Sequence, residues 1–138
     1  MLWSGVGVFM VPQVAKLLRK ERLPDTILCK PAREVLAGTL GAGEADLGSG
    51  LIKKRLARPG GGKRGGYRAI IAYQAPQADR VLVAYAFAKN AASTLTQQGH
   101  EALNKVAQAF MATNNEQLTE LLAAQDVSEV MCDGKNEG

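Results

Sequence analysis

The sequence contains a single histidine, His100, in 138 residues. Hydrolytic triads use an imidazole to activate a serine or a cysteine, and zinc sites draw mainly on several histidines and cysteines. The carboxylates are scattered through predicted helices without the spacing of metal ligands. We therefore expect no catalytic triad, no metal and no other cofactor, and we interpret His100 as a surface residue of a helix.

Cysteine is scarce as well. Cys29 and Cys132 lie more than one hundred residues apart, without the spacing of a zinc site. We expect both to be free thiols in a reducing cytoplasm, with no disulfide. The apolar N-terminal stretch is too short to span a bilayer and lacks the flanking signals of a secretory leader. The chain is therefore predicted to be cytoplasmic, with no membrane as a partner.

Acidic residues are absent between Asp46 and Asp79, and the basic residues gather in this interval. Subtracting the seven most closely spaced from the 17 lysines and arginines leaves ten against 13 acids, so the rest of the chain sums to −3. Such a concentration predicts a site for a polyanion, and the alternative is a solvated glycine-rich turn. The seven basic residues are Lys53, Lys54, Arg55, Arg58, Lys63, Arg64 and Arg68.

The pattern of apolar residues predicts four strands and four helices. Pro31 should kink or break the second helix near Cys29 and Lys30, because a proline inside a helix removes a hydrogen bond and clashes with the preceding turn. Residues 127–132 are expected to form either a short strand or a tail. The strands are expected at residues 6–11, 51–58, 67–73 and 80–88, and the helices at 12–22, 25–40, 94–112 and 116–124.

This order predicts an α+β fold in which residues 1–132 form a single domain and residues 133–138 a disordered tail. The centre is expected to be a small antiparallel sheet of about four strands. The two N-terminal helices should pack on one face of this sheet, and C-terminal helices should follow. A glycine-rich hairpin loop, residues 59–66, should connect the second strand to the third.

The segment from Gly50 to Tyr73 reads G-L-I-K-K-R-L-A-R-P-G-G-G-K-R-G-G-Y-R-A-I-I-A-Y, and the following strand ends in F-A-K-N at residues 87–90. This combination resembles the RelE-type toxins of bacterial type II toxin–antitoxin systems, in the RelE/ParE superfamily. The resemblance is dense over residues 44–90. It implies a RelE/ParE-like fold, cleavage of messenger RNA, usually on the ribosome, and silencing by a cognate antitoxin, which we expect to be of the helix-turn-helix type.

The resemblance also implies roles for individual residues. Arg68 is predicted to contact the phosphate or the transition state, and beside Lys89 many relatives carry an arginine where this chain has Asn90. Tyr67 is predicted either to stack on a base or to lie in the core. The predicted catalytic residues are Arg68, Lys54, Arg58 and Lys89, and the predicted RNA-binding residues are Lys53, Arg55, Lys63, Arg64, Gly65, Gly66 and Tyr67.

Cations alone can support RNA cleavage, because RNA carries its own nucleophile in the 2′-hydroxyl. An enzyme that orients this hydroxyl in line with the adjacent phosphate and surrounds the developing charge with arginine and lysine needs no metal. We therefore interpret the chain as a metal-independent endoribonuclease that inhibits translation. Two alternatives remain open: a noncatalytic inhibitor of DNA gyrase, as the ParE-like relatives are, and an inactive RNA-binding remnant of the same fold.

Overall fold

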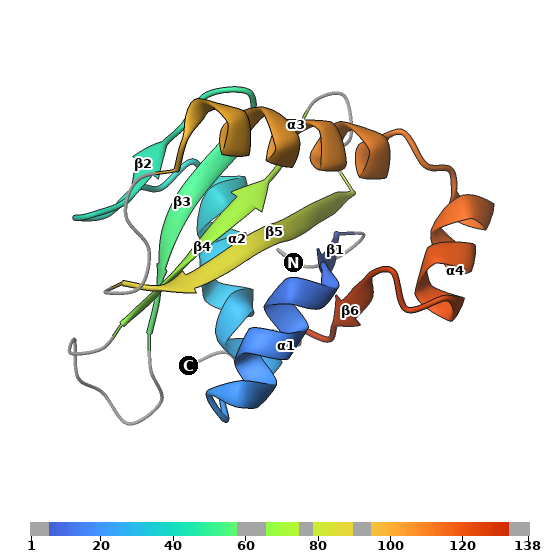
Figure 1. The fold of residues 1–138 in the computed structure, drawn as a ribbon, viewed down its shortest axis with the longest axis horizontal. Helices are drawn as coiled ribbons and strands as arrows, with labels where there is room; N and C mark the ends of the chain where they lie inside the picture. The colour runs from blue at the N-terminus through green and yellow to red at the C-terminus, as the bar shows by residue number, and fades with distance from the viewer. Residues whose placement is uncertain (1–5, 58–65, 75–78, 90–94, 133–138) are drawn as a thin grey trace.

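The computed structural model describes residues 6–57, 66–74, 79–89 and 95–132 (Figure 1). None of the helices in these segments combines the length and the apolar character that crossing a bilayer requires. The elements, in chain order, are β1 (Gly7–Met10), α1 (Pro12–Lys20), the 3₁₀-helix η1 (Asp25–Leu28), α2 (Cys29–Ala37), β2 (Ala45–Asp46), β3 (Leu51–Leu56), β4 (Tyr67–Ala72), β5 (Arg80–Ala88), α3 (Gln97–Met111), α4 (Asn115–Ala123) and β6 (Ser128–Val130).

The described strands form one six-stranded sheet in the order β2-β3-β4-β5-β1-β6. The α+β class is confirmed, but two details of the expected sheet are wrong. The sheet is mixed, because β1 runs parallel to β5 while the other neighbours are antiparallel. It also has two more strands at its edges: β6, which is the short-strand alternative expected for residues 127–132, and β2, whose two residues are too few to show an alternating pattern in sequence.

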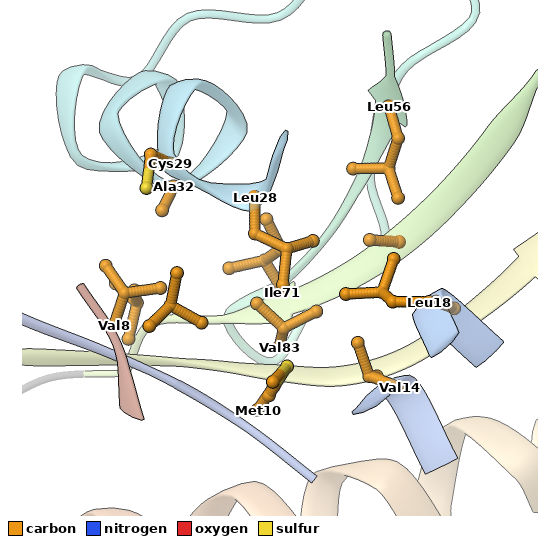
Figure 2. Close-up of a cluster of buried hydrophobic side chains, with 14 of the residues drawn as sticks. Val8, Met10, Val14, Leu18, Leu28, Cys29, Ala32, Leu56, Ile71 and Val83 are labelled. Carbon is orange, nitrogen blue, oxygen red and sulfur yellow. The ribbon is translucent and has the colours of Figure 1, made fainter. Parts of the chain in front are cut away.

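Helices cover both faces of the sheet (Figure 1). On one face, α1, η1 and α2 bury apolar side chains such as Val14, Leu28 and Ala32 against the strands, and Figure 2 shows this cluster. On the other face, α3 buries Phe110 and Met111 with residues of the central strands. The sheet is therefore the middle of three layers. The central strands are partly covered by helices on both faces.

The predicted break before Pro31 is confirmed. The chain is 3₁₀-helical over η1 and becomes α-helical at Cys29, so that Pro31 is the third residue of α2. A proline is tolerated there, because the first N–H groups of a helix have no partner within the helix. Gly38 then ends α2 in the left-handed region at φ 74°.

Both ends of α3 are held by specific hydrogen bonds. The Thr96 hydroxyl accepts a hydrogen bond from the Gly99 N–H at 2.9 Å and caps the first turn. At the other end, the buried Arg80 side chain donates from Nη1 to the Phe110 and Thr113 carbonyl oxygens at 3.3 and 3.1 Å. The Arg80 guanidinium also lies 5.4 Å from the centre of the Phe110 ring. These contacts fix α3 across the sheet.

The expectation of two free thiols is wrong, because Cys29 and Cys132 form a disulfide with their Cα atoms 5.6 Å apart. Cys29 is the first residue of α2, and Cys132 follows β6, which adds to the edge of the sheet beside β1. The pairing depends on this added edge strand. The spacing of the cysteines in sequence carries no sign of it.

Candidate functional site

The alternation of β3 sends its adjacent basic side chains to opposite faces of the sheet. Leu51 packs in the cluster beneath α3, and residues 53 and 55 share its face. Leu56 packs in the cluster beneath α1 and α2, and Lys54 shares that other face. Lys53 and Arg55 are therefore the β3 cations on the α3 side of the sheet.

Hydrogen-bonded pairing places further side chains beside them. Arg55 lies directly opposite Arg68 of β4, and Arg68 lies opposite Phe87 of β5. Like charges directly opposite each other on neighbouring strands destabilise a sheet. An anion bound between the two arginines would remove this repulsion.

A cavity of about 600 Å³ opens between this face and the beginning of α3. Three of its lining residues are cations, from β3, from β4 and from the end of β5, and no carboxylate lines it among the residues that the structure describes. Phe87 supplies an aromatic wall and lies 5.7 Å from Tyr85, measured between ring centres. The lining residues are Gly43, Leu47, Lys53, Arg68, Ile70, Phe87, Lys89, Leu95, Thr96, Gln97 and His100.

A second cavity, of about 440 Å³, lies beside the first, towards α2. Arg68 and Lys89 line both cavities, and the second adds the cations Lys30 and Arg55. Two carboxylates, Glu34 and Glu44, also line it. The two shared cations thus stand between two hollows in the surface.

Arg68 is half-buried, and its only hydrogen bond among the described residues runs from Nη1 to the Tyr67 carbonyl at 3.3 Å. In the described part of the chain, neither Lys53, Arg68 nor Lys89 has a carboxylate oxygen within 4.0 Å. The guanidinium fork of Arg68 therefore keeps most of its donors for a ligand. A strand arginine that served only to neutralise a neighbouring acid would have a carboxylate within ion-pair distance.

Lys54, which the resemblance predicts to be catalytic, lies in a buried ion-pair cluster. Its side chain is 0% exposed, and Nζ lies 3.0 Å from Glu34 and 2.6 Å from Glu44. The Thr39 carbonyl accepts a third contact at 2.9 Å. An ammonium with its donors satisfied on the far face of the sheet cannot reach a ligand in the cavity.

Glu44 in turn fixes the loop that borders the site. Burial raises the pKa of its carboxyl, but hydrogen bonds from Lys54 and from the backbone N–H groups of Arg55 and Gly41, with the Lys54 charge, outweigh this and lower the pKa. The carboxylate accepts from Gly41 at 2.7 Å and from the Arg55 N–H at 3.0 Å. Gly43, at φ 77°, is thereby held over Arg55 and Arg68, where a Cβ would lie 3.8 Å from Nη2 of Arg68.

Two of the predicted RNA-binding residues do not line the cavity that α3 covers. Tyr67 is buried in the core beneath α1 and α2, and its hydroxyl donates to Glu21 at 2.5 Å, so the core interpretation replaces base stacking. Gly66 lines the second cavity and accepts a hydrogen bond from the Lys89 N–H at 2.9 Å. The predictions for Arg58, Lys63, Arg64, Gly65 and Asn90 fall outside the described residues.

His100 is the cavity residue that sequence reasoning missed. It lies in the first turns of α3, is half-buried and lines the cavity with Lys53, Arg68 and Lys89. The signal was present, because residues 100, 103, 107 and 110 recur at helical spacing and His100 extends the inward stripe of α3. Because His100 matches no motif of the resemblance, the sequence by itself favours a surface position for it.

Comparison with protein families gives a match over most of the chain. The model of the family described as RelE toxin of the RelE/RelB toxin–antitoxin system matches residues 6–130. No match was found among curated proteins. The matched range contains every strand and helix of the described structure and all the residues that line the two cavities.

Proposed function

Because the chain belongs to the RelE toxin family, whose partner is an antitoxin, we propose that it is an endoribonuclease that cleaves ribosome-bound messenger RNA and so inhibits translation. The reaction we propose needs no metal, and it takes place in the cytoplasm, where the message and the ribosome are. The partner that silences the toxin is, in this proposal, a helix-turn-helix-type antitoxin.

The observation that carries the proposal is the gathering of cations around one cavity that no carboxylate lines among the described residues. Lys53, Arg68 and Lys89 come from three different elements and line the same hollow. A phosphodiester would supply the negative counter-charge for these cations. A guanidinium group can bind two phosphate oxygens at once. Phe87 offers a flat apolar surface on which a base can stack.

In this proposal, the scissile phosphate binds at the wall that the two cavities share. Arg68 and Lys89 line both hollows, so a phosphate bound to them would have one nucleotide on either side. In such a position the two cations would stabilise the negative charge that develops when the 2′-oxygen attacks phosphorus. We therefore assign catalysis to Arg68 and Lys89, and RNA binding to Lys53, Arg55 and Gly66. Arg58, Lys63, Arg64 and Gly65 remain proposed contacts.

Expression of the protein without its antitoxin should arrest growth through translation. Primer extension on an induced reporter message should reveal cuts within translated codons. Intact messages together with relaxed plasmid would instead indicate inhibition of gyrase, and intact messages with normal plasmid would indicate an inactive remnant.

Replacing Arg68 by alanine tests the site itself. We expect the cleavage rate to fall by about 10²-fold or more, because one preorganised electrostatic donor is lost. Arg68→Lys keeps the charge without the planar fork, so its residual rate separates charge from bidentate geometry. The matched control is Arg19→Ala, which removes an exposed arginine from α1 on the opposite side of the sheet. Equal cleavage by the Arg68 and Arg19 variants would show that Arg68 is not part of the active site.

A further inference from the structure

The position of His100 in the cavity is set by contacts on two sides. Its backbone N–H donates to the Thr96 carbonyl at 2.8 Å, in the turn that the Thr96 side chain caps. Its ring nitrogen Nε2 lies 3.1 Å from the Leu47 carbonyl oxygen, in the turn between β2 and β3. The imidazole is thus held between a helix and a sheet edge.

The contact with Leu47 also decides where the ring carries its proton. A carbonyl oxygen only accepts hydrogen bonds, so Nε2 must donate and carry the hydrogen. In the neutral ring, Nδ1 then keeps its lone pair and can accept a proton. A histidine oriented by a carbonyl partner on one nitrogen is a suitable base on the other.

No carboxylate lines this cavity among the residues that the structure describes, and Glu34 and Glu44, which line the second cavity, are paired with Lys54. Lys53 of β3, Arg68 of β4 and Lys89 after β5 are protonated cations, and on α3 itself the cavity is lined by the uncharged Thr96 and Gln97. Glu101, the next residue of α3, is exposed and does not line the cavity. Imidazole is the side chain that changes its charge between about pH 5 and 8.

We propose that His100 is the general base of the cleavage reaction, an assignment that rests on the proposed nuclease function. The O–H bond of the 2′-hydroxyl breaks and its proton passes to Nδ1, which gives an imidazolium. The 2′-oxygen forms a bond to phosphorus as the bond from phosphorus to the 5′-oxygen breaks, and the leaving oxygen takes a proton from water. The products are a 2′,3′-cyclic phosphate and a 5′-hydroxyl, and the imidazolium returns its proton to solvent.

His100→Gln tests this assignment, because glutamine can still donate to the Leu47 carbonyl but does not titrate. Single-turnover cleavage of a message on programmed ribosomes should slow by about 10²-fold or more. The wild-type rate should rise with pH as a general base loses its proton, and the variant should lack that rise. A histidine that only braced α3 would lower the melting temperature and leave the shape of the pH profile unchanged. Lys105→Ala, an exposed cation of α3 outside the cavity, is the control and should keep the wild-type profile.

Because the chain has one histidine, its imidazole signals can be followed directly by NMR. Adding an oligonucleotide with a 2′-deoxy group at the cleavage position should shift the Nδ1 resonance, and Arg68→Ala should weaken this shift. Wild-type cleavage that is matched by His100→Gln in rate and pH profile would overturn the assignment while leaving the nuclease function intact. An absence of wild-type cleavage would overturn the nuclease function and the base role, and the NMR shift would still show whether His100 lies against the nucleotide.

Discussion

A lysine ammonium removed from water requires acceptors on several sides, and Lys54 has three of them in two carboxylates and a carbonyl. Its neighbour Lys53 has different surroundings, since it lines a cavity to which the described part of the chain contributes no carboxylate. Two adjacent lysines with identical intrinsic properties thus differ only in the face of the strand on which they lie. At the scale of the residue, the direction of the side chain decides between a structural and a functional cation.

Replacing Lys54 by alanine should destabilise the fold by about 3 kcal/mol or more, because Glu34 and Glu44 would be left without their shared counter-charge. Lys53→Ala, at a half-buried position on the cavity side, should cost about 0.5 kcal/mol or less. Urea unfolding of both variants measures the difference. Equal losses for the two variants would contradict the structural role of Lys54.

The pH dependence of the free energy of unfolding provides a second test of the pairing between Lys54 and Glu44. The pKa of Glu44 is lowered in the folded state, so its contribution is fully present above the ordinary value of 4.5 and is lost as pH falls through the lowered folded pKa. Lys54→Ala removes a hydrogen bond and a charge that lower this pKa. The free energy of unfolding of that variant should therefore depend less steeply on pH below 4.5 than that of the wild type.

At the scale of the element, α3 determines the shape of the site, because its beginning closes the cavity and its end is anchored elsewhere. Arg80 holds the end through the Phe110 and Thr113 carbonyls, while Thr96 caps the beginning. The existence of α3 could be predicted from its apolar spacing. Its anchoring by Arg80 could not, because an arginine at the start of a predicted strand carries no sign of the helix end that it will meet.

Arg80→Ala should destabilise the protein by about 2–3 kcal/mol, because it leaves buried carbonyl groups without a charged donor. Hydrogen exchange should show the last turns of α3 opening more readily, with a smaller effect in α1. Lys105→Ala on the exposed face of α3 serves as the control, with an expected change of about 0.5 kcal/mol or less. Unchanged protection at the end of α3 in the Arg80 variant would show that the apolar contacts alone hold the helix.

At the scale of the whole molecule, the sequence predicted the class of fold and most of its elements, and it missed the features that depend on distant partners. The strand at 80–88 and the break before Pro31 follow from local chemistry. The parallel pairing of β1 and the disulfide each join residues from opposite parts of the chain, whereas β6 is one of the two alternatives expected for residues 127–132. The burial of Lys54 could not be predicted for a related reason, because only packing shows which face of β3 meets α3.

The disulfide should contribute about 2–5 kcal/mol to stability, because Cys29 and Cys132 are separated by 103 positions and their link restricts the unfolded chain over this distance. A reducing agent should lower the midpoint of urea unfolding of the oxidised wild type. Cys132→Ser should start at the lower midpoint and show no response to the reductant. If the reductant leaves the wild-type midpoint unchanged, the link does not stabilise the folded state.

The parallel pairing of β1 also sets an order of events during synthesis. Gly7 pairs with Arg80 and Val8 with Val130, whereas β3, β4 and β5 pair with their neighbours in sequence. At about 5–20 residues per second, residue 80 is added about 4 to 15 s after residue 7. During this interval the apolar N-terminal strand has no partner within the sheet and is open to chaperones.

The meander β3-β4-β5, which carries Lys53, Arg55 and Arg68, has low contact order and can form before β6 completes the edge. The cationic surface of this protein is therefore expected to assemble earlier on the translating ribosome than the fold that supports it.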